Sequence, residues 1–280
     1  MWKTVVYGLA AFSAVFPVFA GDLNLRFVTQ STTDLENQHD VRLAPDGSVL
    51  YVSDLGHDRI VALNPQSLDF VFSFGEADLS SPHDIDFDDK GRAYVADTHN
   101  NRVVIYEIEN QRATKVSELK GKISGPEGVL IHPNGLTYVA GAWSNNVVVF
   151  KDGAPIQELT GLSSPHDLEL APDGNIWLAD AGNDRMLLLS PQLVVIKELS
   201  GPKYGFDGVR YQDVMADGTL IAADKYNDRV VIIAPDGDVQ GVLDKGHKPF
   251  KTPEGVEIQG DSLWISDSGN DRVLRFEFKP

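Results

Sequence analysis

The sequence of 280 residues contains no cysteine. This absence excludes a disulfide framework, a thiolate metal site and a cysteine nucleophile. Positive charge is also scarce, because 24 Lys and Arg residues stand against 41 Asp and Glu residues and give a formal net charge of −17. A surface this acidic repels phosphate backbones, so we expect no nucleic-acid partner.

The signatures of several other catalytic mechanisms are missing as well. There is no Gly-x-Ser-x-Gly elbow to support a serine triad. There is also no phosphate-binding loop and no dinucleotide fingerprint. We therefore expect any catalysis to use histidines, carboxylates and a metal ion bound by them.

The first 20 residues have the features of an export signal. Lys3 provides the positive start, Thr4–Phe19 the apolar stretch, and a small-residue cleavage pattern ends at Ala20. No basic stop-transfer flank follows, which argues against a membrane anchor. We predict a signal peptide at 1–20, a mature domain at 21–280 without a membrane span, and a secreted or periplasmic location.

The mature sequence consists of copies of one short unit. In Ser81–Tyr106, three apolar runs are separated by a tight turn and a polar loop. Asp54 and Asp97 occupy the same place in successive copies and are 43 residues apart. This period is typical of four-stranded propeller blades, which have about 40–50 residues. Pro-Asp-Gly and Asn-Gly turns between the runs indicate hairpins.

At each end of the mature sequence, the pattern of strands is incomplete. The sixth copy ends at Pro280 with three strands, and Leu23–Gln30 is a strand with no partner in its own neighbourhood. Pairing the two would complete the last blade and remove both free edges. We predict an all-β fold, a six-bladed β-propeller closed by its N-terminal strand, and we expect a monomer.

The repeated pattern resembles the NHL repeat. It is carried by Ala96-Asp97-Thr98-His99-Asn100-Asn101-Arg102, by Ala179-Asp180-Ala181-Gly182-Asn183-Asp184-Arg185 and by Ser266-Asp267-Ser268-Gly269-Asn270-Asp271-Arg272. The resemblance implies an NHL-type six-bladed propeller, a fold that hosts binding modules and enzymes alike. The Asp and Arg of this pattern recur in five of the six copies. We interpret them as structural, because a pair needed in nearly every blade serves the blade.

A different position in the repeat carries the candidate site. The first position of each inner strand is titratable in every copy: His39, His83, Glu127, His166, Asp207 and Glu254. Inner strands line the central channel and their starts share one rim, so these side chains should form a ring. Imidazole and carboxylate are ligands for zinc and similar divalent ions. The pattern predicts a metal site at the channel mouth, or otherwise polar groups that bond to loops and line a water-filled mouth.

Short segments around the histidines resemble a second family, the peptide-amidating lyases that act on peptidyl-hydroxyglycine. Pro82-His83-Asp84-Ile85 and Pro165-His166-Asp167-Leu168 are similar to its Pro-His-x-[Ile/Leu] segments, and Gln38-His39-Asp40-Val41 differs only in lacking the Pro. The resemblance implies a catalytic zinc on three histidines, although that family takes them from alternate blades. It also implies a structural calcium at an aspartate that follows such a histidine: Asp40, Asp84 or Asp167.

The loops between second and third strands should open on the same rim. We interpret Tyr226 and His99 in these loops as candidates for proton transfer, and Tyr226 resembles the loop tyrosine of the amidating lyases. Blade three departs from the repeat, with Gly141 in place of the Asp and Val147 in place of the Arg. Departures of this kind often mark function. We interpret Trp143 in that loop as a substrate platform, or as a surface residue packed on the neighbouring blade.

Two classes of function fit these observations. One is a metal-dependent lyase or hydrolase that acts on a small molecule or peptide at the channel mouth. The other is a non-catalytic propeller scaffold that binds a peptide or protein partner.

Overall fold

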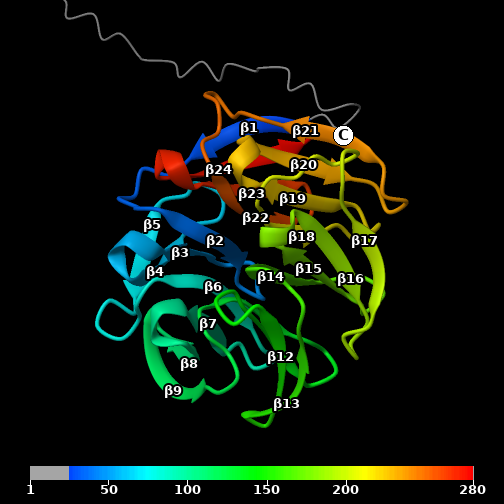
Figure 1. The fold of residues 1–280 in the computed structure, drawn as a ribbon. Helices are drawn as coiled ribbons and strands as arrows, with labels where there is room; N and C mark the ends of the chain where they lie inside the picture. The colour runs from blue at the N-terminus through cyan, green and yellow to red at the C-terminus, as the bar shows by residue number, and fades with distance from the viewer. Residues whose placement is uncertain (1–24, 280) are drawn as a thin grey trace, which may run out of the picture.

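Six four-stranded antiparallel sheets, arranged as the blades of a propeller, are formed by residues 25–279, the part of the chain that the computed structural model describes (Figure 1). The predicted export signal and Leu23 lie outside these residues. Among the described residues, no helix is long and apolar enough to cross a membrane.

The strands of each blade follow one another outward from the channel. Blade one contains β2 (Gln38–Leu43), β3 (Leu50–Asp54), β4 (Arg59–Leu63) and β5 (Phe70–Phe74). Blade two contains β6 (Pro82–Phe87), β7 (Ala93–Asp97), β8 (Arg102–Glu109) and β9 (Arg112–Leu119). Blade three contains β10 (Pro126–Ile131), β11 (Thr137–Gly141), β12 (Asn146–Lys151) and β13 (Ala154–Leu159).

Blades four to six repeat this order. Blade four contains β14 (Pro165–Leu170), β15 (Ile176–Asp180), β16 (Arg185–Leu189) and β17 (Val195–Leu199). Blade five contains β18 (Val209–Val214), β19 (Leu220–Asp224), β20 (Arg229–Ile233) and β21 (Val239–Leu243). Blade six contains β22 (Pro253–Gln259), β23 (Ser262–Asp267), β24 (Arg272–Phe278) and β1 (Leu25–Gln30). Five blades carry a 3₁₀ turn between second and third strands: η1 (Leu55–His57), η2 (Thr98–Asn100), η3 (Ala181–Asn183), η4 (Lys225–Asn227) and η5 (Ser268–Asn270).

The N-terminal strand closes the ring, as predicted. β1 pairs antiparallel with β24, with Leu25 opposite Phe278 and Gln30 opposite Leu274 (Figure 1). Leu25 is only 4% exposed and belongs to the same apolar cluster as Phe276. The strand therefore contributes side chains to the core as well as a hydrogen-bonded edge.

The hydrophobic core lies between the blades rather than in one central mass. Each apolar cluster combines side chains from neighbouring blades, as where Leu168 of blade four packs in one cluster with Tyr138 of blade three. The same applies where the ring closes: Trp264 of blade six packs with Val41 of blade one, and its Nε1 donates to the Pro65 carbonyl at 2.8 Å. A blade thus buries its faces only when both neighbours are present.

The recurring Asp and Arg hold the turn between second and third strands, in agreement with their structural interpretation. In blade four, Arg185 Nε donates to Asp180 Oδ2 at 2.7 Å, and Asp180 Oδ1 accepts from the Ser163 N–H at 2.7 Å. The carboxylate therefore ties the turn to the segment that leads into the inner strand. The Arg-to-Asp bond recurs at 2.6–2.8 Å in the other four blades, at Arg59, Arg102, Arg229 and Arg272.

Blade three replaces this pair with smaller groups. Gly141 pairs across the hairpin with Asn146, so Asn146 stands in the place of the Arg. The prediction that Val147 replaces the Arg was wrong by one residue. Ser144 Oγ donates to Asn146 Oδ1 at 2.6 Å and accepts from the Ser124 N–H at 2.9 Å. The serine thus takes over part of the role of the missing carboxylate.

A second repeated contact joins each blade to the next. The residue that follows each 3₁₀ turn, or Asn145 in blade three, is an Asn or Asp in the left-handed region with φ of 50–54°. Its side-chain oxygen accepts a backbone N–H from the neighbouring blade at 2.7–3.1 Å. The six acceptors are Asp58, Asn101, Asn145, Asp184, Asp228 and Asp271. Asn and Asp tolerate this conformation better than other non-glycine residues, which explains their recurrence.

Removing the closing strand should weaken the whole propeller. A chain that starts at Ser31 loses the β1–β24 pairing and exposes the β24 edge. Compared with a chain that starts at Gly21, its melting temperature should fall by several degrees, as expected for a loss of about 1–3 kcal/mol in a domain of this size. Identical thermal unfolding curves for the two chains would contradict this role of β1.

Breaking one repeated ion pair should cost stability without changing the channel mouth. Arg185→Ala leaves the fully buried Asp180 carboxylate without its cation, which should lower the free energy of unfolding by about 1–3 kcal/mol. Arg112→Ala, at an exposed arginine of β9, is the matched control and should be neutral. Denaturant unfolding checks both variants, and unchanged stability in Arg185→Ala would refute the structural interpretation.

Candidate functional site

Each inner strand begins with an irregular pairing. In β2, β6 and β14 the register with the second strand shifts between the first and fourth residues, for example between Pro82 and Ile85. An irregularity of this kind lets two successive side chains point to the same side. Side chains at both positions meet those of other blades: the His39 and His83 rings of neighbouring blades lie 4.4 Å apart, and the Tyr211 hydroxyl of blade five donates to the His83 and Glu127 carbonyls at 3.2 and 3.1 Å.

The first of these positions forms a ring at one end of the channel. Its members are His39, His83, Glu127, His166, Arg210 and Glu254. The structure therefore brings together five of the six predicted side chains.

Asp207 is the exception, and Arg210 stands in its place. Asp207 is exposed and precedes β18, and Val209 pairs with Asp224 as Pro82 does with Asp97 in blade two. The register of the hairpin thus sets the ring position three residues later than predicted. One sequence signal was available: Arg210 lies 44 residues after His166 and 44 before Glu254.

One half of the ring is a carboxylate between two imidazoles. Glu127 Oε2 lies 2.5 Å from His166 Nε2, and Glu127 Oε1 lies 3.9 Å from His83 Nε2. The other ring nitrogens face carbonyls: His166 Nδ1 lies 2.8 Å from Ser164 O and His83 Nδ1 lies 2.9 Å from Ser81 O. A carbonyl accepts only, so each Nδ1 carries a proton. The 2.5 Å between His166 Nε2 and Glu127 Oε2 is a hydrogen-bond distance, so a proton lies between these two atoms as well.

The other half of the ring is an ionic cluster. The Glu254 carboxylate is fully buried, with Lys225 Nζ at 2.5 Å, Arg210 Nε at 3.8 Å and His39 Nε2 at 3.6 Å. Lys225 is the first residue of η4 and reaches the ring from above. The sequence did not predict Arg210 or Lys225 as ring residues. Lys225 in particular occupies a turn position that carries Thr98 or Ser268 in other blades.

Burial dominates the acid–base properties of the histidines. Desolvation lowers the pKa of His83 to about 4, against the opposing effect of Glu127, and burial with nearby positive charge lowers the pKa of His39 well below its usual range. Both imidazoles are therefore neutral at neutral pH. For Glu127, burial alone would raise the pKa, but the interactions with His166, His83 and Arg210 lower it to about 2.

Several buried atoms of the ring have no hydrogen bond. Within the described residues these include His39 Nδ1, Arg210 Nε and Glu254 Oε2, whereas Glu127 Oε2, His166 Nε2 and Glu254 Oε1 have the close contacts given above. Buried polar atoms usually have partners. Their concentration at one ring marks it as a place where a ligand would gain interactions.

A second set of carboxylates lies next to the ring along the channel. Asp40, Asp84 and Asp167 are buried, and burial together with their mutual repulsion raises the pKa of Asp40 and Asp167 well above the usual value. Asp84 Oδ2 accepts from the Val129 N–H at 2.6 Å, which joins the inner strands of blades two and three. These aspartates thus connect blades that share no ladder at the channel.

Arg42 neutralises part of this charge further along the channel. It lies 2.7 Å from Glu169, 3.1 Å from Asp86 and 3.6 Å from Glu257. Burial is the largest influence on Glu257 and raises its pKa to about 7 despite Arg42. One arginine therefore faces carboxylates from three other blades.

The donor atoms suit a divalent ion in their chemistry. Imidazoles with Nδ1 held by a carbonyl, next to a carboxylate, are how proteins commonly bind zinc. In the arrangement described for residues 25–279, however, no three His, Asp or Glu side chains surround a point where an ion would sit. Glu127 instead lies directly against His166, and an ion would have to separate the two.

The other candidates lie on the same rim, above the ring. Trp143 is 51% exposed, covers Gly125 and lies 5.5 Å from the His99 ring between centroids. Trp143 therefore does contact the neighbouring blade, yet half of it remains open to solvent. Tyr226 is 56% exposed and its hydroxyl accepts from Arg210 Nη2 at 3.3 Å, so it is connected to the ring through Arg210.

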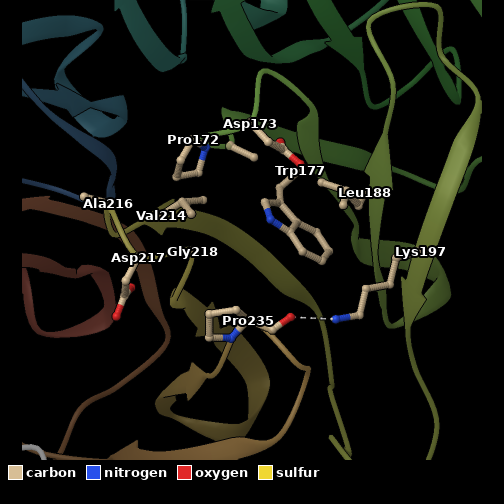
Figure 2. Close-up of a pocket in the computed structure, with 11 residues that line it drawn as sticks. Pro172, Asp173, Trp177, Leu188, Lys197, Val214, Ala216, Asp217, Gly218 and Pro235 are labelled. Atoms are coloured by element: carbon tan, nitrogen blue, oxygen red, sulfur yellow. Dashed lines mark hydrogen bonds between the residues drawn. The ribbon is translucent and has the colours of Figure 1, made fainter.

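A cavity lies away from this rim. It has a volume of about 270 Å³ and lies between blades four and five. Trp177, Leu188 and Pro235 line it, with the Lys197 amine donating to the Pro235 carbonyl at 3.1 Å (Figure 2). The turn between β14 and β15 borders this cavity, whereas the ring lies at the other end of those strands. No titratable ring residue takes part in it.

The comparisons support the fold class. A model of the NHL repeat matches residues 79–106, which contain most of blade two. The protein is a six-bladed β-propeller with an NHL repeat. No curated protein matches the sequence.

Among solved structures, the chain is similar to two kinds of enzyme. Virginiamycin B lyase from Staphylococcus aureus is 12% identical, with 92% of this chain and 100% of that chain covered and a TM-score of 0.65. A gluconolactonase from Xanthomonas campestris is 15% identical, with 96% and 93% covered and a TM-score of 0.70. At these identities the likeness shows the fold alone.

The buried carboxylates predict an unusual dependence of stability on pH. The pKa of Glu257 is raised to about 7 and that of Asp84 to about 6, so the folded state holds protons that the unfolded state has released. Stability from these groups is full below about pH 4 and is lost as the pH rises through 6 to 7. His39 and His83, whose pKa values are lowered, act in the opposite direction and cost stability as the pH falls from about 6.5 to 4. Above about pH 6.5 only the carboxylates among these groups still change the stability, so the melting temperature should fall as the pH rises from about 6.5 to 8.

Glu257→Gln tests this assignment. It keeps an oxygen that can accept from the Leu43 N–H but cannot ionise, so the loss of stability between pH 6 and 8 should be smaller than in the wild type. Glu109→Gln, at an exposed glutamate, is the control and should follow the wild-type curve. Parallel curves for Glu257→Gln and the wild type would contradict the assignment.

Proposed function

We propose that this protein is a lyase or hydrolase that acts on a small molecule or peptide at the ring, with a divalent metal ion, zinc by donor type, as its cofactor. The supporting observation is that blades two, three and four place two imidazoles with fixed Nδ1 groups around the Glu127 carboxylate. The fold likeness to a lyase and a gluconolactonase agrees with an enzymatic role.

The metal would be held by His83, His166 and Glu127, with His39 as the third imidazole. His39 is close enough to take part, since its ring lies 4.4 Å from that of His83. Bound there, such an ion would supply Lewis acidity at neutral pH without any serine or cysteine. The resemblance to amidating lyases points to the same three histidines.

The remaining rim residues have distinct roles in this proposal. Tyr226 moves a proton, because its hydroxyl is exposed and its contact with Arg210 connects it to the ring. His99 and Trp143 form an aromatic surface that orients the apolar part of the substrate. His99 is a second candidate for proton transfer, although its contact is with Trp143 rather than with the ring.

A structural calcium ion among Asp40, Asp84 and Asp167 belongs to the same proposal. The three carboxylates are buried close together and their mutual repulsion favours either protons or a cation. An oxygen of Asp40 has no hydrogen bond within the described residues. Oxygen donors of this kind suit calcium better than zinc.

The alternative is a non-catalytic scaffold that binds a peptide or protein. It is favoured by the burial of the ring, in which the three histidines and two glutamates are at most 7% exposed. A substrate would need the rim to open over these groups, whereas a partner could bind the exposed Trp143 and Tyr226 without reaching them. In either case we propose a monomer, and the predicted export signal favours a place of action outside the cytoplasm.

Metal content and turnover together test the proposal. Protein purified without a histidine tag should contain close to one equivalent of zinc or a similar ion by elemental analysis. His166→Gln should lose it, and His247→Gln, at an exposed histidine outside the ring, should keep it. Turnover should be sought with virginiamycin B, gluconolactone and a peptide that ends in α-hydroxyglycine, and it should disappear in His166→Gln.

Two results would refute this proposal. The first is far substoichiometric metal with no gain on adding zinc. The second is a His166→Gln variant that retains both its metal and its turnover. Either result would favour the alternative interpretation, in which the protein is a non-catalytic binding scaffold.

A further inference from the structure

We infer that Arg210 and Lys225 form a subsite that binds a carboxylate of the ligand. The inference rests on the proposed function only in taking the ring as the place where a ligand binds. It adds the chemical class of that ligand, an organic acid with an apolar part.

The charge of the ring is unevenly distributed. Both fixed positive charges come from blade five, where Arg210 begins the inner strand and Lys225 begins η4. Glu254 is the one carboxylate between them, at 2.5 Å from Lys225 and 3.8 Å from Arg210. Glu127, the other ring carboxylate that acts on Arg210, lies against His166, so the two cations of blade five are only partly balanced at this side of the ring. Partly balanced positive charge of this kind stands out in a protein with a net charge of −17.

The neighbouring loop adds to this positive region. It contains the exposed residues Lys245, Lys248 and Lys251 and connects β21 to β22. The loop is held at the rim, because the Lys251 carbonyl accepts from the Gly269 N–H at 2.9 Å and the Thr252 N–H donates to Asp228 at 2.7 Å. Asp228 follows η4 directly, so Lys251, at the end of this loop, lies on the same part of the rim as Lys225, whereas Gly246 packs against the outer strands of blade six. Lys251 therefore adds to the attraction of an acidic ligand to this side.

Arg210 has unused hydrogen-bonding capacity. Its Nε is buried and has no hydrogen bond within the described residues, and its contact with the Tyr226 hydroxyl is long at 3.3 Å. The guanidinium lies 5.8 Å from the Tyr226 ring centroid, which limits its movement. A planar guanidinium held in this way is suited to a carboxylate, which can accept two parallel N–H bonds.

The opposite side of the rim has a different character. Blade two lies across the ring from blade five, and there His99 and Trp143 offer an aromatic surface. A ligand that spans the ring would place its acidic group on blade five and its apolar group on blades two and three. The reacting bond would then lie over His83, Glu127 and His166.

A matched pair of probes tests the subsite without turnover. N-acetylphenylalanine and its amide share the aromatic group and differ only in the carboxylate. Their binding is measured by calorimetry on protein treated with EDTA, so that no metal ion can bind the acid. The acid should bind at least about tenfold more tightly than the amide, and added NaCl should reduce this preference.

Variants assign the preference to blade five. Lys225→Met should remove most of the preference for the acid. Arg210→Lys keeps the charge but loses the two parallel N–H donors of the guanidinium, and it should reduce the preference. Lys90→Met, at an exposed lysine in the turn at the other end of blade two, should retain it. Thermal unfolding of each variant shows that it is folded before binding is measured.

The inference is overturned if the acid does not bind, if acid and amide bind equally, or if folded Lys225→Met keeps the full preference. Its failure can be told apart from failure of the proposed function. Loss of the carboxylate preference in a protein that holds metal and turns over a substrate refutes only the subsite. A clear preference for the acid over the amide, in a protein without metal or turnover, supports the subsite and refutes the proposed enzymatic function.

Discussion

The propeller depends on side-chain oxygens that accept backbone N–H groups from the next blade. Neighbouring inner strands belong to separate sheets and share no ladder, so their N–H groups need other partners. At the rim the partner is the left-handed Asn or Asp after each turn, as where Asp58 accepts from the Ser81 N–H. Inside the channel it is a carboxylate, as where Asp167 accepts from the Gln212 N–H at 2.9 Å. These contacts fix the rotation of each blade, and thereby the position of every ring residue.

Most of the architecture could be predicted because it is repeated. The period, the turn residues and the Asp-to-Arg pair each occur in at least five copies, so an error in one copy changes little. The closing strand was predictable for another reason: the two ends of the chain each lacked a strand, and one pairing satisfied both.

The errors fall where one blade departs from the repeat. Blade five reads Val209-Arg210-Tyr211 where the other blades have a Pro (Gln38 in blade one), an acid or histidine, and an Asp or Gly. Phe206-Asp207-Gly208 resembles the pattern more closely, yet the pairing of β18 with β19 decides the register. The two halves of the ring could not be foreseen, since the distances between Glu127 and His166 and between Lys225 and Glu254 depend on how blades are rotated against each other. Sequence spacing carries no such information.

Closure by β1 determines at which stage of synthesis the protein can complete its folding. Leu25 pairs with Phe278, so the first strand to be synthesised waits for the last one. Until the C-terminus is available, the first blades have one uncovered face and the ring stays open. Contacts between residues so far apart in the chain form late. A protein of this design acquires its final stability only after synthesis is complete.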